Sequence, residues 1–217
     1  MGAITRAAAN NITTGGIILP AGINDASVAS ISALAQVSGG DGITLISSQT
    51  ASNSASISFT TGIDSTYRTY LFKFINIHAL TNTDLFRFNM STDGGSNYNV
   101  TKTSTWFEAY HSESGAGGAI TYDVSSDLAQ STSDQRIVRA MYTASDANAS
   151  GYMYLFNPSS TTYVKHFMSN CNNVQYEDYS QQYIMAGYGN TTSAINAIIF
   201  RMETGNFNGT IQMYGIA

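Results

Sequence analysis

The sequence predicts an all-β protein: a jelly-roll-like antiparallel β-sandwich with an N-terminal extended or short helical arm. Two observations carry this prediction. From Ile43 onward apolar and polar residues tend to alternate, which is typical of half-buried strands. Turns rich in Gly, Asn, Ser and Asp separate these segments. Many short strands at such spacing indicate a sandwich or a jelly roll.

The composition predicts a surface that is polar with few charges. Asp, Glu, Lys and Arg make up 11% of the 217 residues, against about 25% in ordinary soluble domains. Ser, Thr, Asn and Gly supply the polarity instead, and 14 Tyr and 10 Phe supply most of the bulk. Short hydroxyls and amides lose little side-chain entropy when they are ordered. This balance favours a rigid extracellular or assembly-borne protein over a cytosolic enzyme.

The first 42 residues differ from the rest, because they contain no aromatic residue and end in the Gly39–Gly42 turn cluster. Later in this segment an apolar residue recurs at every third position. A short helix capped by Asn24 or Asp25 and an extended arm fit that period equally well. We expect residues 1–42 to form an attachment or oligomerisation arm and residues 43–217 to form the β-sandwich domain. The apolar residues expected to bury against neighbouring chains are Ile4, Ile12, Ile17, Ile18, Val28, Ile31, Leu34 and Val37.

The strands are expected in order along the second segment. Residues 85–90 alternate as a half-buried strand does, and Asp93 opens a strong turn signal after them. Tyr70–His78 is apolar on both faces, which suits a central strand covered on both sides. Residues 131–142 fit a helix and a strand equally well. Further strands are expected at Ile43–Ser48, Ala55–Thr60, Thr105–His111, Tyr152–Phe156, Thr162–Met168, Gln182–Tyr188, Ser193–Met202 and Thr210–Ile216.

The sequence contains no catalytic motif. Two carboxylates can act together in a glycosidase, but a β protein of this size scatters such acids by chance. Cys171 has no indicated base or orienting group, which a nucleophile needs. No phosphate loop, dinucleotide fingerprint or hydrolase elbow occurs. We therefore expect no enzyme and no cofactor. The acids weighed for a catalytic pair are Glu108, Glu113, Asp123, Asp127 and Asp134.

Metal binding has little support in the sequence. His78, His111 and His166 share no short ligand spacing, so ordinary strand or loop histidines are expected. Asp93, Asn97 and Asn99 offer oxygen ligands around a Gly-rich turn, yet their spacing does not match a calcium-binding EF-hand loop. Stabilisation of the turn is the simpler interpretation, and we expect no metal site.

Two aromatic residues are candidates for binding a sugar. Trp106 and Tyr110 share one face of an expected strand, and Phe107 lies on the other face. Aromatic faces can stack on sugar rings, although a single Trp is more often part of a core. We keep Trp106 and Tyr110 as possible glycan contacts, with core packing as the alternative.

Charge and hydropathy exclude two classes of partner. The net charge of −5 leaves no basic face for a nucleic-acid backbone. No stretch approaches 18 apolar residues, so we expect no membrane span. The N-terminus carries no apolar run typical of a secretory signal. A single Cys cannot make an internal disulfide, so stability is expected to come from packing and from subunit association.

Five segments of the β region resemble a small family of tailed-bacteriophage virion proteins, especially from phages of marine bacteria. They are SASISFTTGIDSTY at 54–67, FINIH at 74–78, NMSTDGGSNY at 89–98, LFNPSSTT at 155–162 and GTIQMYGI at 209–216. The N-terminal segment is similar to the attachment segments of phage fibre and decoration proteins. The resemblance implies a structural role, usually as a trimer, with no catalytic residues to carry over.

We therefore expect a virion structural protein on the exterior of the capsid or tail. It would be a trimeric capsid decoration (cement) protein or a short fibre-head protein, anchored by its N-terminal arm. Its partners would be further copies of itself and other virion proteins, such as the major capsid or tail proteins. The alternative is a receptor-binding tail-fibre module that recognises a host surface glycan through Trp106 and Tyr110.

Overall fold

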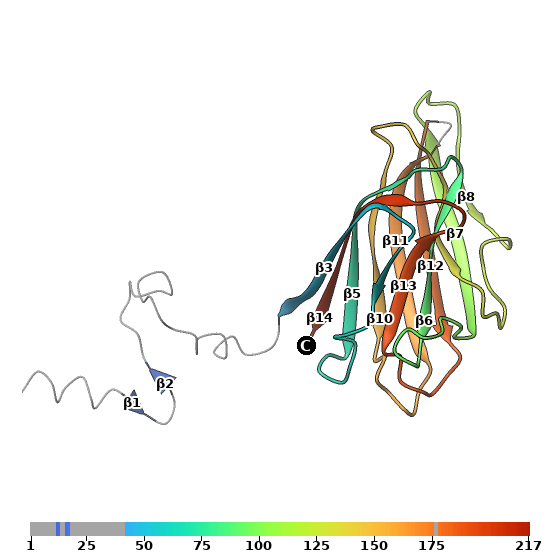
Figure 1. Cartoon of the computed structure of the whole chain (residues 1–217). Coiled ribbons are helices and arrows are strands. Elements are labelled where there is room, and N and C mark those ends of the chain that lie inside the picture. Colours follow the sequence, from blue (N-terminus) through green and yellow to red (C-terminus); the bar gives the residue numbers. More distant parts are fainter. Residues whose placement is uncertain (1–11, 14–15, 18–41, 176–177) are drawn as a thin grey trace, which may run out of the picture. The chain divides into compact units, whose positions relative to one another are not determined.

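The computed structural model describes residues 12–13, 16–17, 42–175 and 178–217 (Figure 1). The chain divides into two units, Met1–Asp41 and Gly42–Ala217. The first unit contains β1 (Ile12–Thr13) and β2 (Gly16–Ile17), which pair antiparallel. Ile12 lies opposite Ile17 in this pair. The other expected anchors of the arm lie outside the described residues; they are Ile4, Ile18, Val28, Ile31, Leu34 and Val37.

The second unit is built from strands, and its described residues include no helix. Every strand pair in it is antiparallel. This confirms the prediction of an all-β antiparallel fold. The strands are β3 (Ile43–Ser54), β4 (Ser56–Phe59), β5 (Thr69–Ala79), β6 (Asp84–Ser91), β7 (Lys102–Ser112), β8 (Gly118–Tyr122), β9 (Gln135–Met141), β10 (Ala149–Phe156), β11 (Lys165–Gln175), β12 (Tyr179–Gly189), β13 (Ala197–Met202) and β14 (Phe207–Ile216).

These strands form two layers. The large layer has the strand order β3-β14-β5-β10-β11-β12-β7-β8, and the small layer has the order β9-β6-β13-β4. One residue pair, Gln175 of β11 with Met141 of β9, joins the layers into a continuous sheet. The result is a sandwich that is nearly closed along this side.

Phenylalanine rings fill the space between the layers. Phe200 of β13 lies at the centre, with its ring centroid 5.3 Å from that of Phe72 and 5.2 Å from that of Phe74. These two rings come from β5 in the opposite layer. Phe88 of β6 makes a similar contact with Phe167 of β11, at 5.1 Å. Alternation along each strand sends these side chains inward and their neighbours outward.

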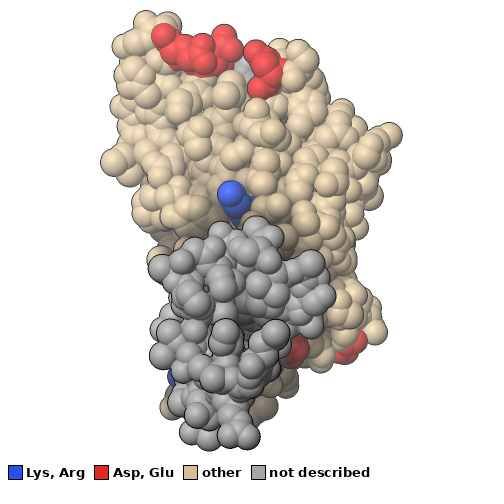
Figure 2. All heavy atoms as spheres, turned by 90° about the vertical axis from the view of Figure 1, so that its left-hand side faces the viewer, with Lys and Arg blue, Asp and Glu red and all other residues tan. Residues whose placement is uncertain are grey.

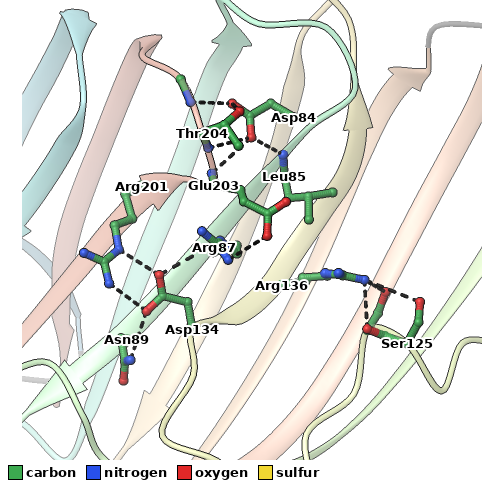
Figure 3. Close-up of polar contacts among 12 residues, drawn as sticks. Asp84, Leu85, Arg87, Asn89, Ser125, Asp134, Arg136, Arg201, Glu203 and Thr204 are labelled. Carbon is green, nitrogen blue, oxygen red and sulfur yellow. Dashed lines mark hydrogen bonds and ion pairs between the residues drawn. The ribbon is translucent and has the colours of Figure 1, made fainter.

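Buried Asp84 fixes one end of the small layer. Its carboxylate accepts hydrogen bonds from the backbone N–H groups of Leu85, Glu203, Thr204 and Gly205 (Figure 3). These contacts tie the start of β6 to the turn between β13 and β14. A carboxylate that accepts several N–H groups can remain buried without a cation.

Most expected strands are present, but their extents and surroundings differ in four places. β3 runs for 12 residues rather than six, because it pairs with β14 along its whole length. Residues 131–142 contain a strand, β9, and no helix. β8 was not predicted, since its five residues GAITY are all exposed and show no buried face. The expectation that Tyr70–His78 is covered on both sides is wrong for the described residues, because β5 buries only one face.

Candidate functional site

The outward face of the large layer carries large apolar side chains among uncharged polar ones; we call it the large-sheet face. Along β5, β10 and β11 the residues between the core positions point away from the small layer, and many of them are large and hydrophobic. Tyr152 is 41% exposed and Met168 is 51% exposed. The apolar residues of this face include Leu45, Leu71, Ile75, Tyr152, Tyr154, Phe156, Met168, Ile184 and Tyr214.

The large-sheet face is also almost free of charge. Its strands contain four residues of the types Asp, Glu, Lys and Arg. Lys102, Glu108 and Lys165 are buried, and only Lys73 is exposed. A solvent-facing sheet normally carries polar residues at its outward positions. A nearly uncharged face with a patch of large apolar side chains is therefore typical of a surface that another protein covers.

Three shallow hollows run side by side across the large-sheet face. Their volumes are about 400, 420 and 550 Å³. Tyr152 and Tyr154 line two of them, and Met168 also lines two, so neighbouring hollows share walls. Together they reach from β5 to β7.

The outward face of the small layer is different, because it carries a cluster of ion pairs (Figure 3). Arg201 donates two hydrogen bonds to Asp134, at 2.7 and 2.9 Å. Arg87 donates to Glu203 at 3.1 Å and lies 3.9 Å from Asp134. Burial raises the pKa of Asp134, but the Arg201 hydrogen bonds, Asn89 and the two guanidinium charges outweigh it and lower the pKa. The two faces of the sandwich therefore differ in charge as well as in size.

Acidic side chains of the second unit gather near its upper and lower ends in one view. Figure 2 shows the side that lies at the left of Figure 1, with acidic groups near its upper and lower ends and one isolated basic side chain near its middle.

Trp106 does not offer a ring to a sugar. The structure places it in β7 with 0% exposure, and its ring lies 5.1 Å from that of Tyr183. The glycan role of Trp106 is therefore wrong for this structure, and core packing is confirmed, because β7 turns this face toward the small layer. Tyr110 lies on the same face nearer the end of β7, where it is half-buried and lines an open pocket.

The pocket beside Tyr110, which we call the Glu108 pocket, has a volume of about 270 Å³. Glu108 lies at its base and is 4% exposed. Its carboxylate accepts hydrogen bonds from Arg139 at 2.8 Å, Gln181 at 2.7 Å and Thr121 at 3.3 Å. These three residues come from β9, β12 and β8. Tyr110 and Tyr179 form an edge-to-face pair on the pocket wall, with ring centroids 5.6 Å apart.

A backbone irregularity in β9 accompanies the placement of Arg139. The register of β9 with β6 shifts at this point, and Ala140 has a φ of 52°. Bulges of this kind can re-aim a side chain, and a positive φ in Ala is strained. The Arg139 carbonyl accepts a hydrogen bond from the Tyr183 hydroxyl at 2.8 Å. The guanidinium binds both Glu108 and Asp123, the latter at 3.0 Å.

Two carboxylates, Glu108 and Asp123, therefore share the guanidinium of Arg139, which lines the Glu108 pocket. Burial raises the pKa of Asp123, but hydrogen bonds from Ser125 and Ser126 and the Arg139 charge lower it overall. A glycosidase needs one carboxyl group whose pKa is raised. Asp123, whose pKa is lowered, does not meet this need.

His166 lines one hollow of the large-sheet face, and His78, Cys171 and Asp93 lie outside the Glu108 pocket. Within the described residues, no three His, Cys, Asp or Glu side chains come together as metal ligands. His78 bonds the Ala147 carbonyl through Nδ1 at 2.7 Å. Burial raises the pKa of the Cys171 thiol to about 12, which makes it a poor nucleophile. Asp93 accepts hydrogen bonds from Ser91 and Asn97 that lower its pKa to about 2, and it stabilises its turn.

Sequence reasoning missed several residues of the Glu108 pocket. Gln181 and Tyr179 precede the predicted start of their strand, although they continue its alternation with Tyr183. That alternation was the signal that could have found them. Arg139 lay in the segment that fitted helix and strand equally, and nothing in the sequence marks its bulge.

Comparison with protein-family models, curated proteins and solved structures gave no match. Across the parts of the chain that the structure describes, no helix is long and apolar enough to span a bilayer. The function must therefore be argued from the two surfaces and the pocket.

Proposed function

We propose that this chain is a structural protein of a tailed-phage virion, with a jelly-roll-like sandwich that assembles as a homotrimer. Its role would be capsid decoration or a short fibre head on the virion exterior. The observation that carries the proposal is the apolar, nearly uncharged large-sheet face. The resemblance of five sequence segments to phage virion proteins supports the same role.

The size of the large-sheet face suits a permanent contact between copies. Eight strands about 4.8 Å apart and roughly 10 residues long at about 3.3 Å per residue span about 1,100 Å². A stable interface needs about 800 Å² from each partner. Because Lys73 is the one exposed charged residue on these strands, identical copies can approach with little repulsion. Closed cyclic symmetry buries such a face and leaves no open end.

The first unit provides the attachment in this proposal. Its apolar residues, such as Ile12 and Ile17, would bury against other virion proteins, for example the major capsid protein or a tail protein. The number of copies per virion separates the two structural roles. Hundreds of copies indicate decoration, and a few trimers indicate a fibre head.

Light scattering of the purified chain at micromolar concentration tests the assembly. We expect a mass three times the 23.2 kDa of the monomer. Chelator and reductant should leave this mass unchanged, since Cys171 is buried and no metal cluster is present in the described residues. A monomer under these conditions contradicts the assembly role.

A second candidate function is recognition of a host surface glycan through the Glu108 pocket. It is favoured by the tyrosine pair, Tyr110 and Tyr179, which lies next to hydrogen-bonding groups of Arg139 and Thr121. The volume of about 270 Å³ lies just below the usual small-molecule range of about 300–1,000 Å³, which suits a single sugar ring. Because two carboxylates share one guanidinium, the positive charge of Arg139 is already neutralised. A neutral sugar therefore fits better than an acidic one.

A panel of neutral and acidic glycans tests this second function. If the pocket binds a neutral sugar, Tyr110→Ala should weaken binding at least tenfold, because the ring loses its stacking contact. Tyr163→Ala is the matched control, since Tyr163 is 70% exposed and lies in a loop away from the pocket. Equal loss in both variants, or binding only to acidic glycans, would exclude the pocket as the binding site.

A further inference from the structure

Lys102 is a buried lysine that faces a side-chain amide. It is the first residue of β7 and is 0% exposed. Its Nζ donates hydrogen bonds to Asn89 Oδ1 at 2.6 Å and to the Val100 carbonyl at 2.7 Å. Among the described residues it makes no ion pair within 4.0 Å. A buried ammonium without a carboxylate in contact is costly, so burial increases the share of the neutral amine.

Asn89 is held in a single orientation by its own hydrogen bonds. It lies in β6 and is 1% exposed. Besides Lys102, its Oδ1 accepts from the Met90 backbone N–H at 2.9 Å. Its Nδ2 donates to the Thr132 carbonyl and to Asp134 Oδ1, each at 3.0 Å. Figure 3 shows the amide of Asn89 beside the Asp134 carboxylate. The amide carbon is therefore presented to Lys102 with a donor on its oxygen and an acceptor on its nitrogen.

The amine lies within reach of the amide carbon. The Nζ–Oδ1 distance is 2.6 Å, and a C=O bond measures about 1.23 Å, so Nζ lies no more than about 3.8 Å from Cγ. Productive near-attack geometries place reacting atoms about 3–3.5 Å apart. A small movement of two packed side chains is enough to bring them together.

We propose that Lys102 and Asn89 form an intramolecular isopeptide bond after the chain folds. The lone pair of neutral Nζ attacks Asn89 Cγ and forms the new C–N bond, while the C=O electrons move onto Oδ1. Collapse of this intermediate restores the C=O bond and breaks the Cγ–Nδ2 bond. Nδ2 takes up the proton that Nζ loses and leaves as ammonia. An amine and a primary amide thus become a secondary amide and ammonia, with no oxidant or cofactor.

Two further groups of the cluster have roles in this reaction. The Met90 N–H stabilises the negative charge that develops on Oδ1, as a donor in an oxyanion hole does. Asp134 accepts a hydrogen bond from the leaving nitrogen at 3.0 Å and so holds it in place. Burial lowers the pKa of Lys102 to about 8, with the Asp134 charge opposing the shift, so more neutral amine is present near neutral pH.

A second buried lysine provides an internal comparison. Lys165 is also 0% exposed, and its Nζ donates to the backbone carbonyls of Tyr163 and Thr191. Backbone carbonyl groups are its hydrogen-bond partners, and no side-chain amide is among them. The combination of buried amine, oriented amide and adjacent carboxylate is therefore specific to the cluster of Lys102, Asn89 and Asp134.

The bond would tie the large layer to the small layer. Lys102 begins β7 and Asn89 lies near the end of β6, so the link closes the connection between these strands. A chain with a single Cys has no internal disulfide, and the isopeptide bond provides the covalent restraint instead. This inference does not depend on the proposed virion function.

Intact-mass measurement of the folded full-length chain tests the bond directly. We expect a mass lower by one ammonia than the sequence mass. Trypsin cuts an unlinked chain after Arg87, Lys102 and Arg136. The bond blocks the cut at Lys102, so residues 88–136 should remain together and lack one ammonia. An unmodified mass in the folded wild-type chain overturns the proposal.

Variants locate the reaction if ammonia is lost. Lys102→Arg should restore the full mass, and Lys165→Arg is the matched control that should retain the loss. Asn89→Asp should lose water in place of ammonia, because the leaving group is then a hydroxyl. Asp134→Asn should slow formation at least tenfold while circular dichroism still reports strands. Ammonia loss that persists in Lys102→Arg shows a different modification and overturns the assignment, whatever the folding of the other variants.

Discussion

Phe200→Ala is expected to lower the free energy of unfolding by about 3–5 kcal/mol, as for other buried aromatic residues. Phe200 is 0% exposed, and five phenylalanine rings have their centroids 5.2–6.4 Å from its own. Those rings come from both layers of the sandwich, so the cavity cannot be closed by one strand moving alone. The loss includes the lost burial and the contacts of the surrounding rings.

Chemical denaturation followed by circular dichroism measures this effect. Tyr163→Ala is the control, because it removes an aromatic side chain that is 70% exposed. We expect its midpoint to stay close to that of the wild type. If the Phe200→Ala midpoint also stays unchanged, the two layers do not share the aromatic core described above. The comparison should use equal protein concentrations, since association stabilises the folded chain.

The alternation of apolar and polar residues with a period of two predicted most of the strands. Phe86 and Phe88 alternate with Arg87, and that pattern alone placed the core face of β6 correctly. It failed for β8, because a short edge strand packs against one neighbour, β7, and shows no buried face. It was undecided for β9, where a register shift and the positive φ of Ala140 interrupt the alternation.

The candidate sites were less predictable because they depend on contacts between distant strands. Glu108 and Arg139 are 31 residues apart in the sequence, and they meet because β7 of the large layer packs against β9 of the small layer. The placement of Trp106 depended on which face of β7 points inward, and the sequence left that open. Asn89 and Lys102 are close in sequence, yet their contact needs the turn after β6 to return the chain to the same end of the sandwich.

Tyr70–His78 is the most informative disagreement between expectation and structure. Its sequence is apolar on both faces, but only one face is buried within the chain. The outward residues Leu71 and Ile75 lie on the large-sheet face together with Tyr152. The alternation of apolar and polar residues indicates which side chains are buried, but it does not indicate whether the same chain or a second chain buries them. An apolar outward face is therefore the expected sequence signature of a strand that a second copy covers.

Met168→Lys is expected to separate the proposed trimer into monomers. Met168 is 51% exposed and lines two neighbouring hollows on the large-sheet face, so a longer polar side chain should fit the isolated chain. In a closed assembly the same position recurs in every copy, and each added ammonium loses water without gaining a partner. A cost of about 3 kcal/mol corresponds to more than 100-fold weaker association.

Leu80→Lys is the matched control for this experiment. Leu80 is 40% exposed and lies in the turn between β5 and β6, outside the large-sheet face. Light scattering should give the monomer mass for Met168→Lys and the trimer mass for Leu80→Lys, with the same circular dichroism for both. A trimer that survives Met168→Lys would show that copies meet elsewhere. Dissociation of both variants would show that any added positive charge prevents assembly. The experiment would then contradict the assignment of the large-sheet face as the contact between copies.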